Sequence, residues 1–347
     1  MFSPQRSRMA TDIISCRRGI IRRHACRYVT ALLMTVSSAA PAVDLQGHRG
    51  ARGLLPENTL PAFAKALEIG VTTLELDTAV TRDGVIVVSH DATLNPDITR
   101  DGSGKWIKRD DIAIHNLTWP ELQQYDVGRI DPDSGYAARF PRQRSLDSLR
   151  MPQLAEVFAL ARRAGNGSVR FNIETKISPE HPQRTLPPEA FARALISLVH
   201  AEKLESRVTI QSFDWRTLQV VQREAPQIAT VYLSAQQPWQ DNIRAGDQSS
   251  PWTAGFHVSR YGSVAQMVRA AGGAVWSPYF GEISRDAVRE AQQAGLRVVV
   301  WTVNTEADIA RMFDFGVDGI ISDYPDLLRR VAAARGLTLP AATPVPP

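Results

Sequence analysis

The sequence predicts an α/β fold, namely a (β/α)8 or TIM barrel with a small insertion after a hairpin at the second strand. From residue 43 onward, short apolar runs alternate with amphipathic stretches, the pattern of strands and helices around a parallel sheet. Eight such runs over about 290 residues suit this barrel. The expected strands are residues 44–48, 73–77, 169–174, 208–211, 228–233, 274–277, 297–301 and 319–322.

Amphipathic segments between these strands are predicted to be helices. The clearest are residues 59–68, 188–202, 214–224, 284–294 and 305–313. Gly70, Gly295 and Gly316 follow three of them, at the place where helices commonly end on a left-handed residue. A doubly wound open sheet is the main alternative, but no phosphate-binding glycine fingerprint follows the first strand to support it.

The strand-like run 85–89 does not fit the parallel scheme. Only Thr81-Arg82-Asp83-Gly84 separates it from the run that continues the second strand to Val80, whereas a parallel crossover needs a dozen or more residues. The two runs are therefore expected to form an antiparallel hairpin. With a two-residue turn at Arg82-Asp83, Glu75 would face His90 across the hairpin.

Residues 92–148 are expected to form an insertion over the mouth of the barrel. They are rich in Asp, Arg, Gly and Pro and contain scattered aromatic residues. A connection of this length is usually functional or disordered, and the aromatic residues favour partial order. The barrel domain is expected to span residues 43–336, and the Pro- and Ala-rich tail, residues 337–347, is predicted to be disordered.

Residues 1–42 predict a secretory signal peptide. They hold seven arginines and one acid, Asp12, followed by an uncharged stretch that ends in the small residues Ala40-Pro41-Ala42. The apolar run within that stretch is shorter than the roughly 20 residues that a membrane-spanning helix needs. A disordered basic tail is the alternative, and either Met1 or Met9 is a possible start.

Removal of this segment would change the charge of the chain. The full chain has a net charge of +4, but the segment holds seven of its 40 basic and one of its 36 acidic residues, so the remainder is slightly acidic. The basic isoelectric point is therefore no sign of a nucleic-acid partner. Both cysteines, Cys16 and Cys26, lie in the segment as well. We expect an exported protein, periplasmic or secreted, without a stable membrane anchor.

Three carboxylates at expected strand ends predict a metal site. Glu75 and Asp77 are two residues apart on one strand, so both side chains lie on one face. Like charges there repel one another and lose hydration unless a cation or donors compensate, and arginines alone are the alternative partners. Glu174, at the end of the next expected strand, adds a third carboxylate. This oxygen-rich set suits Mg²⁺ or Ca²⁺.

Two histidines also end strands. His48 closes the first strand, on the face where TIM-barrel active sites lie, and His90 closes the hairpin. Singly, either would more often be structural. Beside a hard metal they suggest acid–base catalysis at a phosphate ester, with one imidazole taking a proton and the other giving one. Arg49 and Lys176 would offset the charge on the phosphoryl oxygens.

Two further residues are candidates for contact with the substrate. Gln211 ends a strand and could form a hydrogen bond to it. Trp301 could line the substrate pocket, where the face of its ring would suit a choline-like cation, and packing in the barrel core is the equal alternative.

The ordered blocks of the chain resemble the glycerophosphodiester phosphodiesterase family. They extend over essentially the whole chain after the predicted signal peptide. The blocks are His48-Arg49-Gly50, Pro56-Glu57-Asn58-Thr59, Glu75-x-Asp77, Thr81-x-Asp83-Gly84, His90-Asp91, Glu174-x-Lys176, Gln211-Ser212-Phe213-Asp214, Trp301-Thr302-Val303-Asn304 and Val317-Asp318-Gly319-Ile320-Ile321-Ser322-Asp323-Tyr324-Pro325.

The resemblance implies a TIM barrel with an insertion after the His-Asp block, and it implies roles for the site residues. These are catalysis for His48 and His90, a divalent cation held by Glu75, Asp77 and Glu174, phosphate contacts from Arg49 and Lys176, and an orienting role for Glu57. The implied reaction is the metal-dependent hydrolysis of a glycerophosphodiester to glycerol 3-phosphate and an alcohol. In that reaction a neighbouring hydroxyl of the substrate attacks phosphorus, and water then opens the cyclic phosphate.

One segment departs from the family pattern. Residues 94–100 read Leu94-Asn95-Pro96-Asp97-Ile98-Thr99-Arg100, where the family often has a leucine followed by Arg-Thr-Thr. This difference bears on head-group specificity more than on the chemistry. Two competing functions therefore stay open: a hydrolase of lysophospholipids or other phosphodiesters, and a binding protein on the same scaffold without catalysis.

Overall fold

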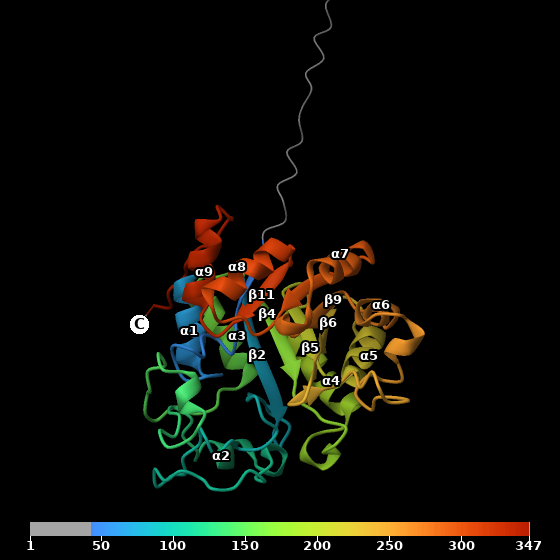
Figure 1. Ribbon diagram of the computed structural model, residues 1–347. Helices are drawn as coiled ribbons and strands as arrows, with labels where there is room; N and C mark the ends of the chain where they lie inside the picture. Colours follow the sequence, from blue (N-terminus) through green and yellow to red (C-terminus); the bar gives the residue numbers. More distant parts are fainter. Residues whose placement is uncertain (1–42, 347) are drawn as a thin grey trace, which may run out of the picture. The chain divides into compact units, whose positions relative to one another are not determined.

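Eight parallel strands close into a barrel in the computed structural model, which describes residues 43–346 (Figure 1). The barrel strands are β1 (Asp44–Gly47), β2 (Thr73–Val80), β4 (Arg170–Thr175), β5 (Val208–Ser212), β6 (Ala229–Ser234), β9 (Val275–Pro278), β10 (Arg297–Val300) and β11 (Gly319–Ser322). Strand β1 pairs with β2 on one side and with β11 on the other, which closes the barrel. This closure confirms the predicted TIM barrel and excludes the open doubly wound sheet.

A helix precedes the next barrel strand in each unit, so the helices surround the barrel (Figure 1). They are α1 (Leu60–Ile69), α3 (Leu154–Arg163), α4 (Pro188–Ala201), α5 (Trp215–Glu224), α6 (Val264–Ala270), α7 (Arg285–Gln293), α8 (Glu306–Phe315) and, after the last strand, α9 (Pro325–Ala334). Gly70 and Gly316 end α1 and α8 with φ of +88° and +80°, as their positions predict.

Side chains alternate between the outside and the inside of the barrel. Outward residues such as Leu74 and Phe171 are buried against the helices in the main apolar core. Inside the barrel, β6, β9, β10 and β11 contribute a separate apolar cluster, whose buried members are Val231, Val275, Val299 and Ile321. The inward residues of β1, β2, β4 and β5 are largely polar, so the interior has an apolar half and a polar half.

The hairpin of β2 and β3 (Ile86–Val88) is antiparallel as predicted, but its expected register is wrong by one residue. Val80 pairs with Ile86. Extended toward the site, this register sets His90 opposite Leu76, so the prediction that Glu75 faces His90 fails.

The turn of this hairpin explains the shift. Thr81 N donates to Val85 O at 3.0 Å around a loop of three residues, and Gly84 N donates to Thr81 O at 3.0 Å. Gly84 has a φ of +84°. A type I turn followed by a left-handed residue is the usual three-residue hairpin loop, and it adds the residue that the expected two-residue turn lacks.

The insertion (Figure 1, teal to green) packs on the face of this hairpin that carries Ala79 and Val87, which is the same face of β2 as Glu75 and Asp77. Its residues Leu94, Ile114 and Leu122, the last from α2 (Trp119–Leu122), are buried with Ala79 and Val87 of the hairpin. This small apolar cluster holds the insertion against the hairpin at the rim of the barrel.

The segment after α9 is irregular but packed against the barrel. Thr343 N donates to the carbonyl of Leu67 at 2.9 Å, and Leu337, Leu339 and Val345 lie against the main core. The disorder predicted for residues 337–347 is therefore not found in residues 337–346, because apolar side chains among the prolines and alanines give this segment a surface to pack with.

The predicted signal peptide, residues 1–42, lies outside the described residues. Among residues 43–346, no helix is both long enough and apolar enough to cross a bilayer.

Candidate active site

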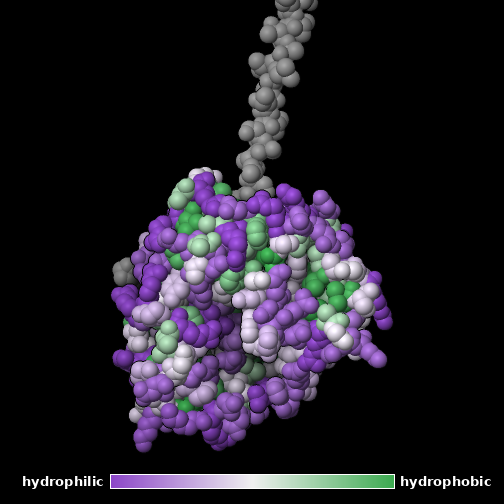
Figure 2. Space-filling model, in the orientation of Figure 1, coloured by the Kyte–Doolittle hydropathy of each residue, from purple (hydrophilic) through white to green (hydrophobic). Residues whose placement is uncertain are grey.

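The carboxyl ends of the barrel strands surround a cavity of about 940 Å³. Figure 2 shows a hollow near the middle of the viewed face, bordered largely by hydrophilic residues. The predicted site residues that line the cavity are His48, Arg49, Glu75, Asp77, His90, Glu174, Lys176, Gln211 and Trp301. Glu57 is the one predicted site residue outside this lining: it lies behind Arg49, whose Nη1 donates to Glu57 Oε1 at 2.5 Å.

The loop after β1 places the first of these residues. Arg49 and Gly50 have φ of +49° and +83°. A Cβ on Gly50 would lie 2.6 Å from the carbonyl carbon of Ala62, so only glycine fits between this loop and α1. The tight path brings the backbone N of Arg49 to Glu75 Oε2 at 2.9 Å.

The three carboxylates converge as predicted. Each of Glu75, Asp77 and Glu174 offers an oxygen, and these oxygens lie within 4.8 Å of one another. In the parallel register of β2 and β4, Asp77 is directly beside Glu174, and all three residues are 1–7 % exposed. The cluster is therefore a concentration of negative charge in a buried place.

Burial acts strongly on this cluster. It raises the pKa of Glu75 well above its ordinary value, and the charge of Asp77 adds to the effect. It also raises the pKa of Glu174 to about 7 in spite of the adjacent Lys176. Burial alone would raise the pKa of Asp77 as well, but the nearby cations, Arg49 first among them, hold it far below its usual range. The three groups need more positive charge than the protein supplies to be ionised together.

The cluster fits a hard divalent cation. Oxygens bound to one Mg²⁺ or Ca²⁺ lie about 2.0–2.6 Å from it, so they can be at most about 5 Å apart, which agrees with the spacing here. The donors are all carboxylate oxygens, the kind that these ions prefer. Glu75, Asp77 and Glu174 are thus the residues that could hold such an ion.

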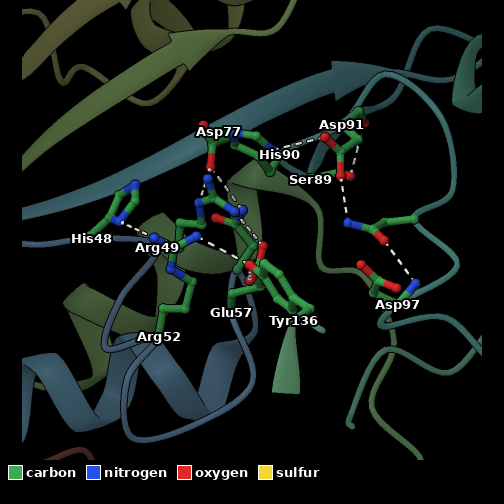
Figure 3. Close-up of polar contacts among 12 residues, drawn as sticks. His48, Arg49, Arg52, Glu57, Asp77, Ser89, His90, Asp91, Asp97 and Tyr136 are labelled. Atoms are coloured by element: carbon green, nitrogen blue, oxygen red, sulfur yellow. Dashed lines mark hydrogen bonds and ion pairs between the residues drawn. The ribbon is translucent and has the colours of Figure 1, made fainter. Parts of the chain in front are cut away.

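Two side-chain cations flank the carboxylates. Arg49 Nε is 3.3 Å from Asp77 Oδ2, between that residue and Glu57 (Figure 3). Lys176 Nζ donates to Glu174 Oε1 at 2.8 Å and is 3.9 Å from Asp77 Oδ1. Both reach the cavity, where they could also meet the oxygens of a bound phosphate.

His48 is held by an aspartate that sequence reasoning did not single out as a site residue. Its Nδ1 lies 2.6 Å from Asp323 Oδ1, at the end of β11. Because a carboxylate only accepts, this contact assigns the proton to Nδ1 and leaves Nε2 as the acceptor, 3.8 Å from Glu75 Oε2. Burial lowers the pKa of His48 to about 4, and Arg52 adds to the effect. The imidazole is therefore neutral at pH 7.

Asp323 is itself fixed on several sides. Arg52 Nε donates to its Oδ1 at 2.7 Å, and Asn304 Nδ2 donates to its Oδ2 at 2.6 Å. Burial alone would raise the pKa of Asp323, but Arg52 and His48 hold it far below its usual range. Asp323 stays ionised and keeps one tautomer of His48.

His90 has a similar arrangement. Its Nδ1 is 2.9 Å from Asp91 Oδ1 (Figure 3). Its Nε2 is 3.2 Å from Lys176 Nζ, which donates to it. Burial lowers the pKa of His90, and Arg49 and Lys176 lower it further. Each histidine is thus anchored at Nδ1 by an aspartate.

The insertion contributes a residue to the site that the sequence did not reveal. Tyr136 donates to Glu57 and accepts from Arg52 Nη1 at 3.1 Å (Figure 3). Burial raises the pKa of Tyr136, so it is a neutral donor. Tyr136 therefore joins the two arginines of the β1 loop from outside the barrel. The spacing between residues 52 and 136 gave no signal for this contact.

An aromatic wall faces the charged side of the cavity. We give this name to Phe213, Trp239, Tyr279 and Trp301, which all line it. Their rings meet edge to face, with centroids 5.3 Å apart for both Phe213–Trp301 and Trp239–Tyr279. Trp239 lies in the turn between β7 (Gln236–Gln237) and β8 (Gln240–Asp241) and is 60 % exposed. Trp301 lines the cavity and also packs against the apolar cluster inside the barrel, so it occupies both of the positions that the sequence offered as alternatives.

Known proteins share this fold and sequence pattern. The chain is 36% identical to the solved structure of a candidate glycerophosphoryl diester phosphodiesterase from Silicibacter pomeroyi, with a TM-score of 0.76 over 86% of this chain and 96% of the other. It is 29% identical to a glycerophosphodiester phosphodiesterase of Caldanaerobacter subterraneus over 81% of this chain and 94% of that protein. An Oleispira antarctica phosphodiesterase, solved with the product sn-glycerol-3-phosphate, has a TM-score of 0.61 at 21% identity over 84% of this chain and 97% of the other, and shares the fold.

The family profile described as the glycerophosphoryl diester phosphodiesterase family matches residues 48–327. This match begins at His48 and includes the carboxylate cluster, both histidines, the insertion and the aspartate that holds His48. The chain belongs to the glycerophosphoryl diester phosphodiesterase family.

Proposed function

We propose that this enzyme hydrolyses glycerophosphodiesters to glycerol 3-phosphate and an alcohol, with the aid of Mg²⁺ or Ca²⁺ and the two histidines. The observation that carries the proposal is the convergence of His48, His90 and three carboxylates on one cavity. Arg49 and Lys176 lie beside the carboxylates, where their positive charges could bind the phosphate of a small phosphodiester. Membership of the family supports the same substrate class.

The two imidazoles suit a pair of proton transfers. One imidazole takes the proton of the substrate hydroxyl that attacks phosphorus, and the other, which enters this step as the imidazolium, gives its proton to the oxygen of the leaving alcohol. When water opens the cyclic phosphate, the two histidines exchange these roles and return to their starting states. The neutral His48, with Nε2 as an acceptor, fits the role of a base in one of these steps.

Glu75, Asp77 and Glu174 would hold the cation at the base of the cavity. The ion would supply positive charge to the phosphoryl oxygens as negative charge develops on them. Arg49 and Lys176 bind and orient the same oxygens from either side, and the buried carboxylates keep these cations in place.

The aromatic wall favours a second substrate class, phosphodiesters that carry an acyl chain, such as lysophospholipids. The cavity has about 940 Å³, near the upper end of typical ligand pockets at about 300–1,000 Å³. Trp239 exposes a large aromatic surface beside it, next to the other rings of the wall, and apolar surface gathered at a pocket is typical of ligand-binding sites. A chain lying on the wall would bury this surface.

We also propose export to the periplasm or out of the cell. The support is the sequence of residues 1–42, with its seven arginines, short apolar run and small-residue ending. The part of the chain after this segment contains no cysteine, so it needs no control of thiol oxidation outside the cytoplasm.

Chelation provides the first test. The purified protein should release glycerol 3-phosphate from glycerophosphocholine, lose this activity with EDTA, and regain it with added Mg²⁺ or Ca²⁺. Glu174→Gln should raise the cation concentration for half-maximal activity at least about tenfold, because it removes a charged ligand. Glu180→Gln, in the loop that follows β4 and paired with Arg244, is the matched control and should change nothing. Activity that EDTA leaves intact would contradict the metal site.

Substitution of Asp323 tests the orientation of His48. Asp323→Asn should lower kcat by about 10²-fold or more, because the charge that fixes the tautomer is lost. Steady-state kinetics should show the same loss in His48→Ala and no further loss in the double variant. Asp326→Asn, three residues away and paired with Arg142, is the control. Additive losses in the double variant would mean that Asp323 does not act through His48.

Substitution of Trp239 tests the second substrate class. Trp239→Ala should lower kcat/KM for lysophosphatidylcholine about tenfold more than for glycerophosphocholine, because an aromatic surface contributes roughly 1.5–3 kcal/mol when it is covered. Trp106→Ala, a substitution in the insertion away from the cavity, is the control. Equal losses on both substrates, which share the choline group, would assign the wall to that group and argue against an acyl chain on it. Unchanged kinetics on both would mean that the wall contacts neither group.

A further inference from the structure

A continuous chain of polar side chains runs through the barrel beneath the carboxylate cluster. TIM-barrel interiors are usually filled with branched apolar residues, as the half formed by β6, β9, β10 and β11 is here. The other half holds Asp44, Gln46, Asn172 and Gln211, which are 1–4 % exposed. Burying an amide costs free energy unless its polar atoms form hydrogen bonds, so the partners of each buried amide indicate what the amide does in the structure.

Asn172 is the centre of this chain. Its Nδ2 donates to Gln211 Oε1 at 2.8 Å and to Gln46 Oε1 at 3.1 Å. Its Oδ1 accepts from the hydroxyl of Thr209 at 2.8 Å. Both N–H donors and one of the two lone pairs of Oδ1 are therefore used. The Thr209 hydroxyl could donate or accept, so the orientation of the Asn172 amide is set by the two glutamine oxygens that face its nitrogen.

Each glutamine then turns its own amide nitrogen toward a carboxylate. Gln211 Nε2 donates to Glu75 Oε1 at 2.7 Å, in the candidate metal cluster. Gln46 Nε2 donates to Asp44 Oδ2 at 3.1 Å, at the opposite end of the barrel. Arg170 meets Asp44 there at 2.9 Å. The row of hydrogen-bonded side chains therefore ends in a carboxylate on each side. Because a carboxylate only accepts, each glutamine must turn its nitrogen outward and its oxygen toward the centre, where the two N–H groups of Asn172 donate to both oxygens.

The direction of the Gln211 amide matters for Glu75. If the amide turned over, its oxygen would face the carboxylate and the two would repel. Gln211 by itself could adopt either orientation, since an amide is nearly symmetrical in shape. The donor of Asn172 permits only the one in which Gln211 Oε1 accepts and Nε2 faces Glu75. With Arg49 N on the other oxygen, Glu75 is fixed from two sides.

We propose that Asn172 is a positioning residue for the metal site, which acts through Gln211 to hold Glu75 in the orientation of a cation ligand. The inference rests on the proposed function, because it needs the cation. It also gives Gln211 a role different from the substrate contact expected from the sequence. Partners that orient ligands in this way typically contribute 10–100-fold to metal affinity.

The test measures cation binding without substrate. Calorimetric titration of the purified protein with CaCl₂ and with MgCl₂ gives the dissociation constants. Asn172→Leu should raise them 10–100-fold, and Gln211→Leu should do the same. Gln46→Leu is the matched control: it removes the same kind of group from the arm that leads away from Glu75, so the dissociation constants should stay within about threefold.

A double variant separates positioning from general damage. If Asn172 acts through Gln211, Asn172→Leu combined with Gln211→Leu should bind the cation no more weakly than Gln211→Leu alone. Multiplied losses in the double variant would overturn the proposal, as would an affinity of Asn172→Leu equal to that of the wild type. Asn172→Ser, which is smaller and still polar, replaces Asn172→Leu if thermal unfolding shows that the leucine variant does not fold, and the same outcomes apply.

The wild-type titration distinguishes this proposal from the proposed function. If the wild type binds neither cation, the metal site itself fails and the role of Asn172 fails with it. If the wild type binds and Asn172→Leu binds equally well, only the role of Asn172 fails, and the proposed hydrolysis stands.

Discussion

Three carboxylates whose oxygens lie within 4.8 Å of one another, in residues that are 1–7 % exposed, set the main physical demand of this structure. Their repulsion and loss of hydration raise the pKa of Glu75 and of Glu174. Arg49 and Lys176 compensate only part of the charge, and a divalent cation would compensate the remainder. Much of the surrounding architecture can be understood as support for this one cluster.

The support comes from different parts of the chain. The left-handed turn at Arg49 and Gly50 brings a backbone donor to Glu75. The insertion adds Tyr136, which holds the partner of Arg49 from outside the barrel. The polar half of the interior adds Asn172 beneath the cluster. The apolar half lies below the aromatic wall, so the division of the barrel interior matches the division of the cavity into a charged side and an aromatic side.

Local sequence patterns were sufficient for the barrel, for the antiparallel pairing of the hairpin and for the convergence of most candidate site residues on one cavity. The eight strands follow from short apolar runs, and the alternation of Glu75 and Asp77 correctly predicts a shared face. Failures arose where one residue or a distant contact decides the outcome. The hairpin has a three-residue loop with a left-handed Gly84, which moves the register by one residue from the expected one. The prediction failed because the sequence of this turn does not distinguish a three-residue loop from a two-residue turn.

Contacts between distant segments were not predictable in the same way. Asp323 meets His48 across 275 positions of sequence, and Tyr136 meets Glu57 across 79, so neither has a spacing that a single sequence reveals. Asp323 lay within a block that resembles the family, and its place at the end of the last strand was the available signal. The packed tail was missed because its three apolar residues are dispersed among prolines and alanines.

The most direct measurement of the central claim is anomalous X-ray diffraction from crystals grown with MnCl₂ and glycerol 3-phosphate. If the carboxylates hold the cation, the map will show an anomalous peak bound by oxygens of Glu75, Asp77 and Glu174, with the phosphate beside it between Arg49 and Lys176 and within reach of His48 and His90. A phosphate bound at the histidines with no anomalous peak at the carboxylates would contradict a cation site there.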